Sequence, residues 1–154
     1  MDYTHDDAGL ARQPIGYWSW AAHEATVTHI RAALAEHGLT QPPWWVLNQL
    51  DGPGGAEGRD RSGLTTMLSG YLDTGTDGME TAVDELLERG LITQDDGSRL
   101  RITPEGRALR GRAYERVTRA SAEIHAGIPD EEFVAALKVL QRMIHNVGGK
   151  AWHH

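Results

Sequence analysis

The sequence predicts a mainly α-helical fold with a small β wing, because three patterns follow one another within residues 79–106. Residues 79–89 carry apolar side chains at helical spacing, which predicts an amphipathic helix. Residues 91–102 contain two short β-prone runs on either side of a turn. Residues 103–106 have the composition that begins a second helix.

Specific residue types support each of these three patterns. Gly90 suits the end of the first helix, since glycine adopts the left-handed conformation without a steric penalty. Asp95, Asp96, Gly97 and Ser98 are turn residues. Thr103 can cap the next helix, and Pro104 at its first position loses no hydrogen bond. The apolar face of the first helix consists of Met79, Ala82, Val83, Leu86 and Leu87. Helix, strand, turn, strand and helix in this order describe a winged helix, a shape that typically reads DNA.

Length and composition exclude several classes of protein. The chain of 154 residues predicts one domain, or one domain with oligomerisation arms. It has no cysteine, so disulfides, zinc–thiolate sites and thiol nucleophiles are excluded. No apolar run approaches the ~18 residues of a membrane span, and the acidic N-terminus does not resemble a signal peptide. We therefore expect a soluble cytoplasmic protein with no membrane partner.

Charge is distributed unevenly around the predicted turn. The formal net charge is −7, and residues 73–96 hold eight acids and one arginine. Residues 99–119, in contrast, hold seven arginines and two acids. A nucleic-acid-binding function depends on this distribution more than on the total charge. The alternative interpretation is two solvated helix faces of opposite sign.

Further helices are expected on both sides of the winged segment. Residues 1–13 predict a loose tail, and Pro14 begins a long helix, about 15–37, with apolar residues on more than one face. Thr40 is the expected N-cap of the next helix. Residues 51–58 are rich in glycine and predict a flexible linker, because they lack the Gly-Lys-Ser/Thr ending of a phosphate-binding loop. Residues 64–72 predict a third helix.

The C-terminal part predicts a long helix over about 104–126 and a final helix with a heptad-like apolar stripe. This stripe comprises Phe133, Leu137, Leu140, Ile144 and Val147. Three acids, Asp130, Glu131 and Glu132, suit the positive N-terminus of that final helix. The stripe must pack against the chain's own core or against a second subunit.

The order of these elements resembles the MarR family of winged-helix transcriptional regulators. The matching residues are Gly38-Leu39-Thr40 with Trp44, Val46 and Leu47; Leu86, Arg89, Gly90, Leu91 and Ile92; and Leu100, Ile102, Thr103, Pro104 and Gly106. The resemblance spans about residues 15–147. It implies a tail (1–13), a dimerisation helix (14–39), a winged helix-turn-helix DNA-binding domain (40–103), a long helix with a terminal dimerisation helix (104–148) and a second tail (149–154).

The resemblance implies a homodimer that binds double-stranded DNA at a pseudo-palindromic operator, with half-sites about one helical turn apart. The recognition helix would span about 77–89, and a wing-tip arginine would enter the minor groove. DNA-contacting residues would be Thr76, Gly78, Glu80 and Thr81 on the helix, Arg99 and Arg101 on the wing, and Arg59 and Arg61 before it. The acids of the recognition helix oppose phosphate binding, so we expect binding that is weaker or more salt-sensitive than that of a basic winged helix.

Aromatic residues suggest a ligand pocket. Trp18, Trp20 and Trp44 would fall where the first and second helices meet, beside the crevice in which MarR family members bind small aromatic effectors. With His23 and Trp45 they are the candidate pocket residues; ordinary core packing is the alternative interpretation. The eight histidines lack metal-ligand spacing and the serines lack a nucleophile motif, so we expect no metal, no cofactor and no enzyme activity.

The function expected from the sequence is a homodimeric DNA-binding repressor that a small aromatic ligand releases. The alternative is a winged-helix dimer without competent DNA reading, which acts as a protein-interaction or ligand-binding module. Cysteine-based oxidant sensing is excluded by composition.

Overall fold

The computed structural model describes residues 2–70 and 75–150, and its fold is mainly helical with a small three-stranded wing. Tyr71 and Leu72, which the sequence predicts to end the third helix, lie outside the described residues, as do Asp73 and Thr74. In chain order the elements are α1 (Asp7–Leu10), α2 (Ile15–Ala35), α3 (Gln41–Asp51), β1 (Arg59–Asp60), α4 (Arg61–Ser69), α5 (Gly75–Glu88), β2 (Ile92–Gln94), β3 (Arg99–Ile102), α6 (Pro104–Ile124) and α7 (Asp130–Asn146). None of the described helices is both long and apolar enough to cross a lipid bilayer.

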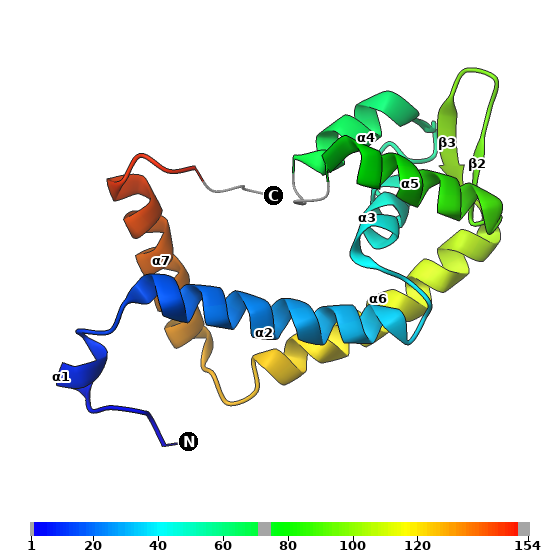
Figure 1. The fold of residues 1–154 in the computed structure, drawn as a ribbon. Helices are drawn as coiled ribbons and strands as arrows, with labels where there is room; N and C mark the ends of the chain where they lie inside the picture. Colours follow the sequence, from blue (N-terminus) through cyan, green and yellow to red (C-terminus); the bar gives the residue numbers. More distant parts are fainter. Residues whose placement is uncertain (1, 71–74, 151–154) are drawn as a thin grey trace.

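Two long antiparallel helices, α2 and α6, lie side by side and form a stalk (Figure 1). The winged domain, formed by α3, α4, α5 and the three strands, lies at one end of this stalk. Helix α7 and the short helix α1 lie at the other end. The predicted order of helices and hairpin is therefore confirmed, and the stalk separates the wing from the chain's terminal helices.

The hydrophobic core lies within the winged domain and at the adjoining end of the stalk. Its fully buried members include Leu34, Val46, Leu47, Leu50, Leu68, Met79, Val83, Leu86, Ile92 and Leu100. These residues come from α2, α3, α4, α5 and both hairpin strands, so each of these elements contributes its apolar face to one core. The apolar face predicted for residues 79–87 is confirmed, because Met79, Ala82, Val83 and Leu86 are buried.

The hairpin and the start of α6 form as the residue types predict. The Asp95 carboxylate accepts hydrogen bonds from the backbone N–H groups of Gly97 and Arg99, which closes the turn between β2 and β3. The Thr103 hydroxyl accepts the Gly106 N–H at 3.0 Å and so caps α6. Pro104 occupies the first turn of α6, as predicted.

The structure corrects the prediction of a flexible linker at residues 51–58. Gly55 and Gly58 are buried, and the following residues form a short strand, β1, that pairs antiparallel with β3. A Cβ atom at Gly55 would lie 2.0 Å from the carbonyl oxygen of Leu50, so only glycine fits this close approach. The segment is a packed loop that joins α3 to the edge of the wing, and the sheet has the order β1–β3–β2.

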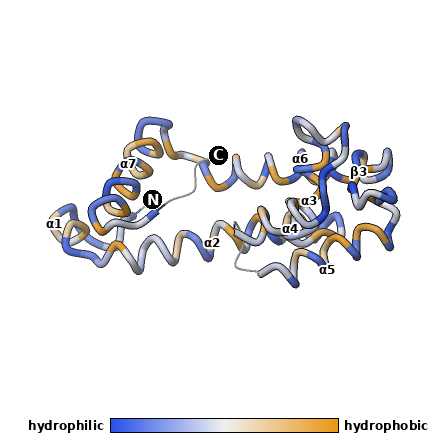
Figure 2. Tube along the Cα trace, turned by 90° about the horizontal axis from the view of Figure 1, so that it is seen from above, coloured by the Kyte–Doolittle hydropathy of each residue, from blue (hydrophilic) through white to orange (hydrophobic). Residues whose placement is uncertain are grey.

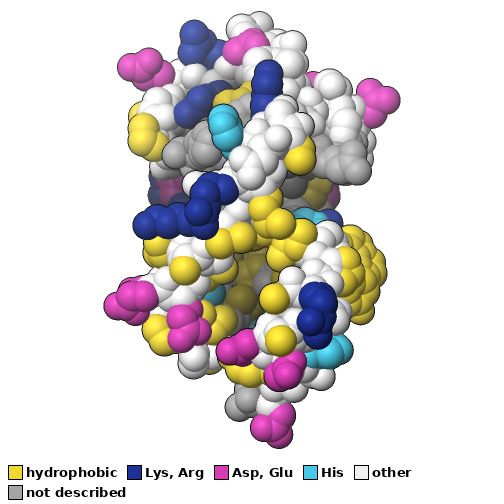
Figure 3. All heavy atoms as spheres, turned by 90° about the vertical axis from the view of Figure 1, so that its left-hand side faces the viewer, with side chains coloured by type: hydrophobic (Ala, Val, Ile, Leu, Met, Phe, Trp, Pro, Cys, Tyr) yellow, Lys and Arg dark blue, Asp and Glu magenta, His cyan; other side chains and the backbone are white. Residues whose placement is uncertain are grey.

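Helix α7 contains no buried residue, although one of its faces is apolar (Figure 2). The described residues include thirteen exposed large apolar side chains. Eleven of them lie on the first turns of α2 or within residues 128–147, which is one end of the stalk. Figure 3 views this end, where hydrophobic side chains gather around a hollow. The predicted stripe therefore does not pack against the chain's own core: Phe133, Leu137 and Val147 are exposed, and Leu140 and Ile144 are half-buried.

Candidate nucleic-acid interface

Helix α5 presents one face to solvent at the edge of the winged domain. Its opposite face is buried in the core, and its exposed positions Asp77, Thr81, Asp84 and Glu88 recur at helical spacing. Three of these four side chains are acidic. Residues 40–103 as a whole hold eleven carboxylates against five arginines, so the winged domain carries an excess of six negative charges.

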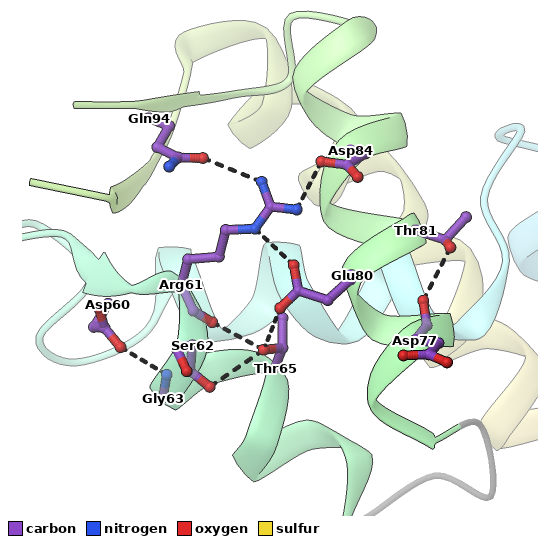
Figure 4. Close-up of polar contacts among 10 residues, drawn as sticks. All are labelled: Asp60, Arg61, Ser62, Gly63, Thr65, Asp77, Glu80, Thr81, Asp84 and Gln94. Carbon is purple, nitrogen blue, oxygen red and sulfur yellow. Dashed lines mark hydrogen bonds and ion pairs between the residues drawn. The ribbon is translucent and has the colours of Figure 1, made fainter. Parts of the chain in front are cut away.

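Arg61, at the start of α4, is surrounded by acceptors from α5 and the wing (Figure 4). Its Nε donates to Glu80 Oε2 at 2.7 Å, its Nη2 donates to Asp84 Oδ1 at 2.7 Å, and its Nη1 donates to Gln94 Oε1 at 3.2 Å. The pKa of Arg61 is raised, chiefly by its hydrogen bond to Asp84 and further by its contact with Glu80. Burial acts in the opposite direction and lowers this pKa. The guanidinium is therefore charged at any physiological pH.

Glu80 points toward α4 rather than away from the domain (Figure 4). Its Oε1 accepts the hydroxyl of Thr65 at 2.7 Å, and Thr65 is buried with 1% of its surface exposed. Both carboxylate oxygens of Glu80 thus have a donor on α4. Arg61 and Glu80, both predicted from the sequence as DNA contacts, are partners of each other in the structure.

The other three predicted arginines hold the packed loop 52–58. Arg59 donates from Nε to the carbonyl oxygen of Gln49 and from Nη2 to that of Pro53, at 2.9 and 2.8 Å. Arg99 donates from Nη1 to the carbonyl oxygen of Gly58 at 2.9 Å, and Arg101 donates from Nη1 to that of Ala56. Among the described residues, Nε and Nη2 of Arg99 and of Arg101 have no acceptor. These donors remain free for an anion.

The remaining predicted contacts are at the N-terminal end of α5. Thr76 and Thr81 are exposed, and Gly78 is partly buried. The Thr81 hydroxyl donates to the backbone carbonyl of Asp77 at 2.9 Å (Figure 4). A hydroxyl on the exposed face of a helix is suited to hydrogen bonding with a base edge or a phosphate.

The arginines of α6 pair mainly with acids of α2 and α3, not with those of α5. Arg107 contacts Asp51 at 2.8 Å, and Arg116 contacts Glu36 at 3.0 Å. The hydrogen bond from Arg116 is the largest cause that lowers the pKa of Glu36 below its ordinary value. These arginines therefore connect α6 to α2 and α3. Among the described residues, the α5 carboxylates that have a cationic partner pair with Arg61 or with Arg89, whose Nη1 lies 2.7 Å from Glu85.

The predicted pocket residues do not come together within one chain. Trp44 is buried and Trp45 half-buried at the start of α3, whereas Trp18, Trp20 and His23 are exposed near the start of α2. Trp20 lies fifteen residues before Ala35, the end of α2 that leads to α3, which is about 22 Å at 1.5 Å per residue. The expectation that these tryptophans meet at the junction of the two helices is therefore wrong for the single chain.

A different concave site lies between the two stalk helices. Ala25, Thr26 and His29 of α2 line it together with Glu123 and Ile124 of α6, around a cavity of about 360 Å³. His29 Nε2 lies 2.6 Å from Glu123 Oε2. Sequence reasoning missed this pair, because 94 positions separate the two residues and no motif connects them. Within the described residues, no group of three or more potential metal ligands is present.

Comparison with solved structures relates this arrangement to known regulators, whereas no family model and no curated protein matches the chain. A MarR family transcriptional regulator from a Rhodococcus species is 29% identical, with a TM-score of 0.65 over 84% of this chain and 92% of that one. A MarR family protein of Mycobacterium tuberculosis in complex with DNA is 24% identical, with a TM-score of 0.64 over 89% of this chain and 99% of that one. The same protein in complex with salicylic acid matches with a TM-score of 0.59, at 24% identity over 84% and 98% of the two chains.

The similarity extends from the stalk through the winged domain, since these neighbours cover most of the chain. It agrees with the order of elements that follow α1 in the structure: the long helix α2, three helices with a small antiparallel wing, and two terminal helices. The structural neighbours over most of the chain's length are members of the MarR family, which are regulators rather than enzymes. The chain therefore has the fold of the MarR family of winged helix-turn-helix transcriptional regulators.

Proposed function

We propose that this protein is a transcriptional regulator, acting as a repressor, that binds a pseudo-palindromic DNA operator as a homodimer. The observation that carries the proposal is the pairing of a winged domain with an apolar surface, at the far end of the same stalk, that the described residues leave exposed. The first feature supplies a shape that fits the major groove. The second supplies a surface through which two copies would place their winged domains symmetrically.

Dimerisation is supported by the burial pattern of the terminal helices. Val147 is 83% exposed, and Phe133 and Leu137 on the same stripe are also exposed. Trp18 and Trp20 on α2 add exposed aromatic surface at this end. Contiguous apolar surface of this kind is rare on a monomeric protein and typical of an interface between subunits.

The DNA-contacting residues in this proposal lie at the N-terminal end of α5 and on the wing. Thr76, Gly78 and Thr81 would face the major groove. Arg99 and Arg101 would use the N–H groups that the loop carbonyls leave free, and Arg59 would support them at the neighbouring strand. A MarR family protein of the same fold forms a complex with DNA, which supports DNA as the partner in this proposal.

A winged-helix dimer without competent DNA reading is the second candidate, and the charge of the winged domain favours it. Asp77 and Glu88, at the two ends of the exposed face of α5, have no cationic partner among the described residues. Carboxylates near phosphates oppose the release of counterions that supplies most non-specific affinity. A protein-interaction or ligand-binding module would retain the dimer and avoid this repulsion.

Selection of bound fragments from a random DNA duplex pool, at several salt concentrations, separates the two candidates. A regulator enriches a palindromic consensus with half-sites about one helical turn apart, and its affinity falls steeply with salt. An absence of enrichment even at low salt would contradict the first candidate and leave the second.

Substitution of the wing arginine provides a direct test of the binding surface. Arg99→Ala should weaken operator binding and reduce the slope of log affinity against log salt by about 0.9 for each phosphate that the side chain neutralises in the wild type. The matched control is Arg112→Ala, because Arg112 is exposed on α6 and has no ion pair among the described residues. Equal effects of both substitutions would show that the wing does not touch DNA, and thermal unfolding of each variant reports any loosening of the loop.

A small aromatic acid is the proposed effector that releases the DNA. This chain shares its fold with a protein that forms complexes with salicylic acid and p-aminosalicylic acid. Titration with salicylate, followed by tryptophan fluorescence and by DNA release, tests this part. Trp18, Trp20, Trp44 and Trp45 are the candidate fluorescence reporters, and His23 remains a candidate pocket residue. A flat response in both measurements would exclude the effector.

A further inference from the structure

Arg61 has a different environment from the other arginines of the winged domain. All three of its guanidinium nitrogens already have acceptors, and its side chain is 22% exposed. Arg99 and Arg101 each donate from one nitrogen only and are exposed. A phosphate could therefore reach Arg99 or Arg101 without breaking an ion pair, whereas it would have to displace a carboxylate from Arg61.

The acceptors of Arg61 belong to the two parts of the domain that would contact DNA. Glu80 and Asp84 are one helical turn apart on α5, and Gln94 ends the strand β2 of the wing. Arg61 itself begins α4, whose position is fixed by the buried residues Leu64 and Leu68. One side chain thus joins α4, α5 and the wing at a single point (Figure 4).

Thr65 fixes the orientation of the Glu80 carboxylate. It lies one turn after Arg61 on α4, is buried, and donates its hydroxyl hydrogen to the other oxygen of Glu80. A carboxylate held by a guanidinium on one oxygen and a buried hydroxyl on the other is fixed in orientation. Glu80 is consequently directed into the α4–α5 contact and away from the groove-facing edge that the sequence predicts for it.

We propose that Arg61 is a positioning residue that fixes the angle of α5 and offsets two of its carboxylates, and that neither Arg61 nor Glu80 contacts DNA directly. The part of this inference that concerns DNA binding rests on the proposed function. With Arg61 in place, the charges of Glu80 and Asp84 are compensated inside the domain. Without it, both would add to the repulsion between α5 and the phosphates.

The first experiment requires no DNA. Thermal unfolding is measured for the full-length wild type, Arg61→Gln, Glu80→Gln and the double variant, with Arg112→Gln as the charge-matched control. Arg61→Gln should lower the midpoint by about 3–6 °C, because it leaves Glu80 and Asp84 without their cation, and Arg112→Gln should leave it unchanged. The midpoint of the double variant should fall by much less than the sum of the two single shifts, and additive shifts would overturn the positioning role.

The second experiment measures affinity for the selected operator at several salt concentrations. The proposal expects Arg61→Gln to weaken binding by about tenfold, and Glu80→Gln in the same chain to recover most of that affinity. A direct interaction of Arg61 with phosphate would give the same weakening whatever residue occupies position 80, together with a salt slope reduced by about 0.9 for each phosphate involved. That result would overturn the proposal.

Arg61→Lys keeps the test decisive if the glutamine variant folds poorly. Lysine retains the charge but has one ammonium group instead of a planar fork, so it cannot hold Glu80, Asp84 and Gln94 together. The proposal expects reduced affinity for Arg61→Lys, whereas a phosphate contact would tolerate lysine. If the wild type binds no duplex, the proposed function fails while the unfolding cycle still decides whether Arg61 positions α5.

Discussion

Gly106 shows at the scale of a single residue how closely α6 approaches the hairpin. It is buried in the first turn of α6, and a Cβ atom at this position would lie 2.0 Å from the carbonyl oxygen of Leu91. That same oxygen accepts the backbone N–H of Thr103 at 3.1 Å, so the backbone there cannot move without losing a hydrogen bond. The position therefore requires glycine for space and not for an unusual backbone angle.

Gly106→Ala should lower the free energy of unfolding by about 2–3 kcal/mol, because the new methyl group would force α6 away from the hairpin. Urea denaturation followed by circular dichroism measures the change. The control is Gly111→Ala in the same helix, where a Cβ would meet nothing within 4 Å. That substitution should stabilise the protein by about 0.5–1 kcal/mol, since alanine favours helix. Destabilisation of similar size at both sites would contradict the explanation.

Residue identity alone predicted the local roles of Thr103, Pro104 and Asp95, since the side chains of Thr103 and Asp95 accept backbone N–H groups two to four positions along the chain. It did not predict the partners of Arg61, which are 19 and 23 positions away on another helix. A charged side chain can pair with many acids, and only the packing of α4 against α5 selects among them. For the same reason, the sequence assigned both Arg61 and Glu80 to the DNA surface.

The stalk, at the scale of elements, is held by ion pairs as well as by apolar contacts. Arg116 of α6 donates to both carboxylate oxygens of Glu36 on α2 at 3.0 Å, and farther along the stalk Glu123 lies 2.6 Å from His29. The hydrogen bond and charge of Arg116 lower the pKa of Glu36 in the folded protein from its ordinary value of 4.5. A lowered pKa means that this carboxylate stabilises the fold above its unfolded-state pKa, and that this contribution is lost as pH falls through the folded value.

Glu36→Gln should therefore reduce the acid sensitivity of the stalk. Between about pH 6 and about pH 3, the unfolding midpoint of the variant should fall less than that of the wild type, because the variant has no proton to bind at this position. Glu24→Gln is the control, since Glu24 is exposed on the same helix and has no ion pair among the described residues. Parallel pH profiles for the wild type and Glu36→Gln would show that the pair with Arg116 does not stabilise the stalk.

Helices and strands whose own sequence shows a regular spacing of apolar residues could be predicted. Elements that form only through contacts with distant parts of the chain could not. The periodic helices and the hairpin turn follow from local spacing and turn chemistry. Strand β1 has two residues and exists only because Arg59 and Asp60 lie opposite Leu100 and Arg99 of β3. The glycines before it resemble a linker in sequence, and only the close approach of Gly55 to Leu50 shows that they are packed.

Over the described part of the chain, the core lies at one end of the molecule, and eleven of the thirteen exposed large apolar side chains lie at the other. Leu137 lies in the middle of the exposed stripe of α7. A stable dimer interface buries about 1,200–2,000 Å² in total and needs a well-packed apolar centre, which α7 and the start of α2 could supply. The sequence predicted the apolar stripe but left open whether it packs against the core of the same chain or against a second subunit. The fold excludes packing against the core of the same chain, because α7 has no buried residue.

Leu137→Glu should convert the proposed dimer into monomers, because a carboxylate in an apolar interface loses its hydration without gaining a partner. Sedimentation equilibrium measures the change in molecular mass, and we expect a shift of at least about tenfold in the dissociation constant. Ala135→Glu, at an exposed position on the opposite face of α7 from Leu137, is the charge-matched control. A wild type that sediments as a monomer, or an unaffected Leu137→Glu dimer, would contradict this assignment of α7.

The exposed stripe of α7 also has a consequence for how long the protein persists in a cell. A helix of 17 residues that buries none of its side chains gains little stability from tertiary packing and is only marginally stable in water. In an unpaired chain, α7 would therefore open often and be the first segment that a protease cleaves. Newly made chains at low concentration would be degraded faster than chains that have found a partner. The protein's turnover would then depend on its own abundance, so that a cell holding few copies would lose them quickly and one holding many would retain them.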